Sequence, residues 1–139
     1  MAEINFPNGS TLLSGDIGSG KSTILLATEF ALFGTRRTNL SGASLLRNGE
    51  NKGSVELSFN IKNKNIKIQR NLLRGKKSIV QDTGYIEIDG ERKDLSTVEL
   101  KQEIINLLNY PQEVLTKSKD LIYRYTVYTP QEEMKLILL

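Results

Sequence analysis

The sequence predicts an α/β fold, and three observations support it. A glycine-rich loop lies between a short apolar segment, Ser10–Ser14, and a segment with helical apolar spacing, Lys21–Phe33. Alternating apolar and polar residues with turn signals follow over about 54–90, a pattern typical of antiparallel strands. A second helix is predicted from Ser96. With 139 residues, the chain can build one modest core.

The elements on either side of the loop are both expected to be buried. Ser10–Ser14 is compatible with a strand and contains the apolar Leu12. Lys21–Phe33 is apolar around most of its circumference, as buried helices are. Gly34 follows and should end this helix in a left-handed conformation.

An antiparallel meander is predicted for the middle of the chain. The preceding segment, Thr35–Gly53, is polar and contains glycines, so it should be a surface loop. Apolar and charged residues then alternate as in a sheet with one exposed face. The strands are separated by turn signals at Asn63–Asn65, Arg74–Lys76 and Asp89–Gly90.

Helices are predicted over about 96–118. Ser96 and Glu99 have the spacing of a capping box. The inner face of this helix is expected to contain Val98, Leu100, Ile104, Ile105, Leu107 and Leu108. Pro111 should open a further short helix, and Arg124–Tyr128 should be a strand. From about residue 132 the chain is expected to begin another helix.

Composition limits the chemistry that the chain can perform. It contains no cysteine and no histidine, so proton transfer must use carboxylates, lysines or water. No apolar run approaches the roughly 20 residues that a membrane helix needs. No secretory leader is recognisable, because the first residues are short and acidic. A cytoplasmic protein fits these observations.

The loop Gly15–Ser22 fits the pattern G-x-x-x-x-G-K-[S/T], and it lies where that pattern requires, between a strand and a helix. Its glycines allow backbone N–H groups to turn toward one anion, and the helix N-terminus adds positive potential. Lys21 should reach the β- and γ-phosphates, Ser22 should ligate Mg²⁺, and Thr23 should contact the α-phosphate. The predicted ligand is ATP with Mg²⁺, and the contacting residues are Gly15, Asp16, Ile17, Gly18, Ser19, Gly20, Lys21, Ser22 and Thr23.

The loop alone leaves several classes of protein open. A transporter ATPase would use an aromatic residue before the loop for adenine stacking, a role that Phe6 could serve. A small-molecule kinase would need an arginine-rich lid, at which only Arg36–Arg37 hints. A GTPase is disfavoured because no Asn-Lys-x-Asp motif is present. A non-catalytic nucleotide-sensing module is the remaining alternative.

The segment Gly15–Gly34, with its Ala-Leu-Phe-Gly ending, resembles the start of the SMC and SbcC-type ATPases and of the archaeal Rad-fifty proteins of double-strand-break repair. The element order over 1–139 resembles the N-terminal lobe of their ABC-type ATPase head. The resemblance implies that Gln131, in a Q-loop at about 129–131, reaches Mg²⁺ and the attacking water, and that a coiled coil starts near 132. It also implies that the meander flanks the adenine, with Arg47–Gly53 near the base and ribose.

The chain departs from this family in three places. Ile17 stands where the family has Asn, and Pro130 and Glu132 flank the glutamine where Arg and Gly are common. The family also begins with a strand and a basic residue upstream, so a shortened N-terminus is expected.

The resemblance further implies partners. A C-terminal lobe would supply the catalytic aspartate and glutamate, and two heads would sandwich two ATP molecules. The dimer would bind DNA and control an Mre-type nuclease, associated with the chromosome. The N-terminal lobe alone should hydrolyse ATP negligibly.

Two further motifs are rejected. Leu40–Ser44 resembles an ABC signature, but it lies too soon after the phosphate loop, and a polar loop is the better interpretation. Tyr85–Glu91 resembles a Walker B strand, but Glu87 interrupts its apolar pattern, and Asp89–Gly90 is a hairpin turn.

The segment 62–77 contains seven basic residues and no acidic one. It is either a DNA-contacting surface or a solvated hairpin face. The candidate DNA contacts are Lys62, Lys64, Lys67, Arg70, Arg74, Lys76 and Lys77.

Overall fold

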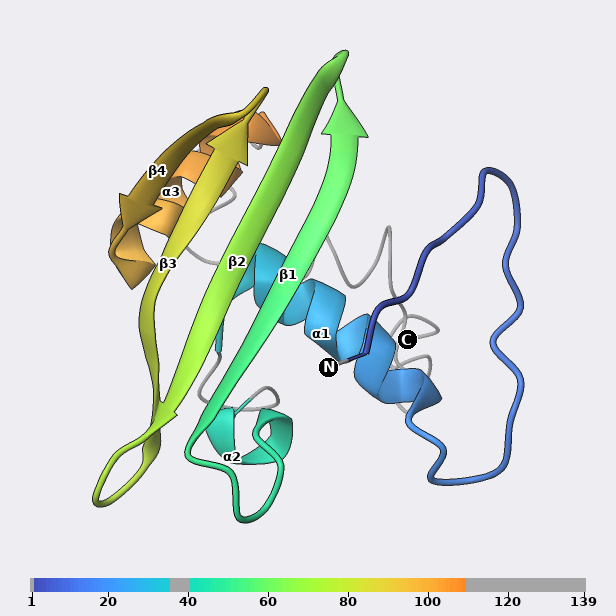
Figure 1. Ribbon diagram of the computed structural model, residues 1–139, viewed down its shortest axis with the longest axis vertical. Coiled ribbons are helices and arrows are strands. Elements are labelled where there is room, and N and C mark those ends of the chain that lie inside the picture. The colour runs from blue at the N-terminus through green and yellow to red at the C-terminus, as the bar shows by residue number, and fades with distance from the viewer. Residues whose placement is uncertain (1, 36–40, 110–139) are drawn as a thin grey trace, which may run out of the picture.

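The computed structural model describes residues 2–35 and 41–109. Its elements are α1 (Lys21–Phe33), α2 (Gly42–Leu45), β1 (Lys52–Ile61), β2 (Lys64–Arg74), β3 (Ile79–Ile88), β4 (Glu91–Leu95) and α3 (Thr97–Leu107). The strands form one antiparallel sheet in the order β1-β2-β3-β4, and α1 and α3 lie behind it in the view of Figure 1. This confirms the meander and extends it by β4. The predicted elements after residue 109 lie outside the described residues.

Two tight turns set the register of the sheet. The β1–β2 turn has positive φ at Lys62 (52°) and Asn63 (61°), and the β3–β4 turn has positive φ at Asp89 (51°) and Gly90 (91°). Such turns match the right-handed twist of paired strands. The first turn falls one residue before the predicted one, and the second lies where it was expected.

The core lies between the sheet and the helices. Ile66, Ile68 and Ile86 of the sheet pack with Leu100 and Ile104 of α3. A second cluster joins Phe30 of α1 to Leu46 and Leu72. Full burial of one such side chain contributes about 1.5–3 kcal/mol. These two clusters hold both helices to the same face of the sheet.

The predicted buried strand Ser10–Ser14 is wrong. Its residues have no strand conformation, and Leu12 is 89% exposed. The four described strands pair only with one another, so within residues 2–35 and 41–109 no strand pairs with the backbone N–H and C=O groups of this segment.

Helix α1 has the predicted bounds but is only partly buried. Its buried residues, Glu29, Phe30, Ala31 and Phe33, all lie in the C-terminal half, and Leu25 is 38% exposed. Figure 1 shows the reason, since the N-terminal half of α1 projects beyond the β1 edge of the sheet. Gly34 ends the helix with φ 78° and ψ −170°, so φ is positive but the backbone is extended, not left-handed helical as predicted.

Helix α3 begins as predicted. The Ser96 side chain accepts from the Glu99 N–H, and the Glu99 side chain accepts from the Ser96 N–H. Leu100 and Ile104 are buried one helical turn apart. Val98 is 76% exposed, against expectation, because it lies two residues and therefore about 200° from Leu100 around the helix.

The segment Thr35–Gly53 is not wholly loop. It contains α2, and β1 already begins at Lys52. Among residues 2–35 and 41–109, no helix combines the length and apolar character that crossing a bilayer requires.

Candidate functional site

The candidate site is the glycine-rich loop before α1. Gly18 and Gly20 have φ of 85° and 90°, values that other residues adopt only with strain. A Cβ at either position would have no atom within 4 Å, so backbone conformation, and not crowding, requires glycine. The space beside these two backbones is therefore open to a ligand.

Lys21 shapes the loop from inside. Its Nζ donates to the carbonyl of Gly15 (2.6 Å), the carbonyl of Asp16 (2.7 Å) and Oγ of Ser19 (3.1 Å). The loop thus closes around one ammonium group, which brings together residues predicted from spacing alone. Asp16 contacts Lys21 through its carbonyl, and the residue is exposed.

The N-terminus of α1 has the electrostatic character of an anion-binding site. Within the described residues, no side chain caps it and no acidic residue occupies its first turn. The positive end of the helix dipole therefore faces the loop with no side chain to offset it, and of the first N–H groups that of Thr23 donates to the Gly20 carbonyl (3.0 Å). Ser22 and Thr23 are exposed in this first turn, where a hydroxyl could ligate Mg²⁺. The residues present thus fit a triphosphate with its metal.

Other predicted site residues stand apart or remain untested. Ile17 is fully exposed, with a relative accessibility of 105%. Gln131 lies outside the described residues. The turn before β1 is held by Arg74, which donates from Nε to the Glu50 carbonyl (2.8 Å) and from Nη2 to the Arg47 carbonyl (3.4 Å).

The predicted basic surface does not form one patch. Arg70 is 2% exposed, so it cannot contact DNA. Its inclusion among the seven candidate DNA contacts was therefore wrong. The alternation of buried Ile66, Ile68 and Leu72 around it is the sequence signal that indicated an inward position. β2 spans 11 residues, so its two basic ends lie roughly 33 Å apart. The lysines at these ends are Lys62 and Lys64 at one and Lys76 and Lys77 at the other.

The two rejected motifs have different outcomes. Asp89–Gly90 forms the tight β3–β4 turn, which confirms that this strand is not a Walker B strand. In the other motif, Gly42 begins α2 and is buried, and a Cβ there would lie 2.7 Å from Ile79 Cγ2. The polar-loop interpretation was therefore wrong for this part, because the short helix packs on β3.

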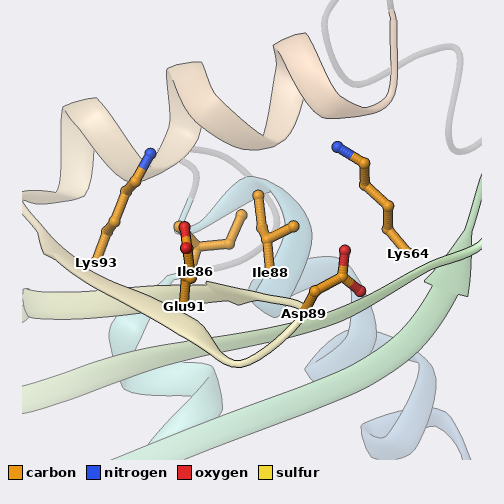
Figure 2. Close-up of a pocket in the computed structure, with 6 residues that line it drawn as sticks. All are labelled: Lys64, Ile86, Ile88, Asp89, Glu91 and Lys93. Carbon is orange, nitrogen blue, oxygen red and sulfur yellow. The ribbon is translucent and has the colours of Figure 1, made fainter.

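A hollow of about 340 Å³ lies elsewhere, beside α3 (Figure 2). Ile86 and Ile88 form its floor, and Lys64, Asp89, Glu91 and Lys93 also line it. Acidic and basic groups alternate around this hollow, so it lacks the one-sided positive field that a polyphosphate needs. The loop before α1 remains the candidate site.

Comparisons with known proteins give one family match and several relatives. A family model described as AAA domain matches residues 2–139. The DNA double-strand break repair Rad50 ATPase of Thermoplasma acidophilum is 31% identical over 134 residues, which cover 96% of this chain and 14% of that protein. The protein of the same name from Thermoplasma volcanium matches with the same identity and coverage. The protein of the same name from Methanococcus maripaludis is 31% identical over 115 residues, which cover 83% of this chain and 11% of that protein. The chain thus spans about one seventh or less of the length of these relatives.

Proposed function

Because this chain belongs to the AAA domain family, we propose that it binds ATP with Mg²⁺ as the N-terminal lobe of an ABC-type DNA-repair ATPase head. One observation carries the proposal: the loop Gly15–Ser22 closes around Lys21 at the uncapped N-terminus of α1. The relatives named Rad50 support the assignment to double-strand-break repair.

Each site residue then has a role. The N–H groups of Gly18, Gly20 and their neighbours bind the β-phosphate, and Lys21 turns its ammonium from the loop carbonyls toward the γ-phosphate. Ser22 would ligate the metal, and Thr23 would contact the α-phosphate. Bound Mg²⁺ would neutralise charge on the phosphates during transfer to water. Gln131 is proposed to orient that water.

The exposed N-terminal segment supports contact with a second lobe. Ile4, Phe6 and Leu12 are 47%, 53% and 89% exposed, and apolar side chains at such positions favour a covering partner. We assign that cover to a C-terminal lobe, which lies in the remaining length of the longer relatives. It supplies the catalytic aspartate and glutamate, and a coiled coil starting near 132 connects the two lobes.

The assembled protein is proposed to work as a dimer on DNA. Two heads enclose two ATP molecules, and hydrolysis controls DNA tethering and an Mre-type nuclease at the chromosome in the cytoplasm. The two basic ends of β2 lie roughly 33 Å apart, close to the about 34–36 Å of one turn of B-DNA. They can therefore contact phosphates one turn apart.

Calorimetry tests nucleotide binding directly. The 139-residue chain should release heat on titration with ATP and Mg²⁺, and Lys21→Ala should remove it. Lys77→Ala is the matched control, because it removes a lysine far from the loop and should bind as the unmodified chain does. Absence of binding by the unmodified chain, or equal binding by Lys21→Ala, would refute the proposal.

A further inference from the structure

Arg70 is a charged side chain buried under the sheet, and it contacts the C-terminal end of α1. Its Nε donates to the Ala31 carbonyl at 2.8 Å, and its Nη2 donates to the Leu32 carbonyl at 3.3 Å. The residue is 2% exposed. A side chain of β2 thus reaches the last turn of the helix whose first turn forms the candidate phosphate site.

These contacts satisfy carbonyls that the helix leaves unpaired. The last four carbonyls of an α-helix have no partner within it. In α1 the Phe30 carbonyl accepts from the Gly34 N–H at 2.8 Å, and Arg70 binds the next two. The positive guanidinium also meets the negative end of the helix dipole. Burial lowers the pKa of Arg70 to about 10, so it remains charged at neutral pH.

The pairing of β2 with β3 is irregular at Arg70. Between the pairs Gln69–Tyr85 and Asn71–Asp82 the β2–β3 register shifts, so Arg70 alone faces two residues of β3. The extra residue lies on β3, whereas Arg70 keeps the inward position that the regular alternation of β2 gives it. On β3, Gln81 accepts from Arg70 Nη1 (3.5 Å) and donates from Nε2 to Thr35 Oγ1 (2.8 Å). Side chains of both strands therefore bind the segment in which α1 ends, Arg70 through the carbonyls of the last turn and Gln81 through Thr35.

We propose that Arg70 is a positioning residue that fixes the direction of α1 across the sheet and thereby places the phosphate loop. The inference rests on the proposed nucleotide-binding function. The N-terminal half of α1 projects beyond the sheet (Figure 1), so its direction is set at the C-terminal end. A helix of 13 residues is about 20 Å long, and a tilt of about 10° would move its far end by about 3 Å.

Two ligands separate positioning from simple stability. ATP must be held at the loop and at the nucleoside, which the family resemblance places beside the meander, whereas tripolyphosphate needs the loop alone. Arg70→Met, which keeps the length but removes the donors, should weaken MgATP binding by about tenfold and Mg-tripolyphosphate binding by less than twofold. Arg70→Lys keeps the charge and one donor, and should recover most of the ATP affinity.

Ile68→Ala is the matched control. Ile68 is fully buried on the same face of β2 but belongs to the cluster with α3. Its replacement should lower the denaturation midpoint without changing the ratio of the two affinities. The proposal is overturned if Arg70→Met binds ATP within twofold of the unmodified chain, or if both ligands weaken in parallel. Should Arg70→Met not fold, the same ratio is measured for Arg70→Gln, which removes the charge and shortens the side chain, and an unchanged ratio there contradicts the proposal. Failure of the unmodified chain to bind either ligand would instead refute the function itself.

Discussion

The hydroxyl of Tyr85 donates a 2.7 Å hydrogen bond to Oε2 of Glu56, across the intervening strand β2. Both residues are paired with Gln69, one on each side. The guanidinium of Arg92 lies 3.9 Å above the Tyr85 ring, within the range of a cation–π contact. One aromatic side chain of β3 thus contacts side chains of β1 and β4 on the face that α1 and α3 leave uncovered.

Tyr85→Phe should lower the unfolding free energy by about 1 kcal/mol at neutral pH, because a partly buried hydrogen bond is lost. Burial, and then the bond to Glu56, raises the pKa of Tyr85 to about 12 from its usual 10. The folded form therefore holds this proton more tightly than the unfolded form, and its contribution falls as pH rises from 10 toward 12. Urea denaturation at pH 7, 10 and 11 should show the difference between the two proteins shrinking. A constant difference over that range would contradict this explanation.

Gly84→Ala should destabilise the sheet by about 1–3 kcal/mol. An added Cβ would collide with the Gln69 carbonyl oxygen and lie 2.9 Å from Leu100 Cδ2. Gly90→Ala is the control, since Gly90 has φ 91° but no atom within 4 Å of an added Cβ, so only backbone strain of about 1 kcal/mol is expected. Thermal denaturation of the two variants should place Gly84→Ala lower. The reverse order would show that β3 can move away from β2 at little cost.

Ser96→Ala should cost about 1 kcal/mol by removing the cap of α3. The hydrogen bonds from Ser96 lower the pKa of Glu99. That carboxylate therefore contributes stability above its unfolded pKa, and the contribution disappears as pH falls through the lower folded value. Denaturation between pH 3 and 7 should show a smaller acid-induced loss in Glu99→Gln. If Glu99→Gln and the unmodified chain lost stability equally on acidification, the lowered pKa of Glu99 would not contribute to acid sensitivity.

Reversing charge at the ends of β2 tests DNA contact. Lys62→Glu with Lys64→Glu, and separately Lys76→Glu with Lys77→Glu, should each weaken DNA binding by the assembled complex. Each lost phosphate contact should reduce the slope of log affinity against log salt by about 0.9. Lys93→Glu, which lies at the hollow beside α3, is the control. Unchanged binding by both double variants at low salt would leave the solvated-hairpin interpretation.

The chain by itself should hydrolyse ATP negligibly even where it binds it. In the proposal, the aspartate and glutamate that hold metal and water come from a second lobe. Phosphate release by the purified chain should match that of Lys21→Ala. Rapid turnover that Lys21→Ala abolishes would overturn the division into two lobes.

Local patterns predicted most of the fold. The capping pair Ser96 and Glu99, the turn at Asp89–Gly90 and the bounds of α1 were all confirmed, because each depends on residues a few positions apart. The strand at Ser10–Ser14 failed because a strand needs a neighbour, which no local pattern supplies. The short α2 was missed because packing of Gly42 on Ile79, and not propensity, holds it.

The sequence by itself predicted the candidate phosphate loop, since glycine spacing, one lysine and one hydroxyl are a local pattern that indicates this chemistry. Only the tertiary structure decided what the basic residues of β2 do. Arg70 is turned inward to the end of α1, and Arg74 holds the turn before β1. Charge along a chain is a local property, but burial and hydrogen-bond partners arise when distant segments meet. The burial of Arg70 required α1, β2 and β3 to be brought together.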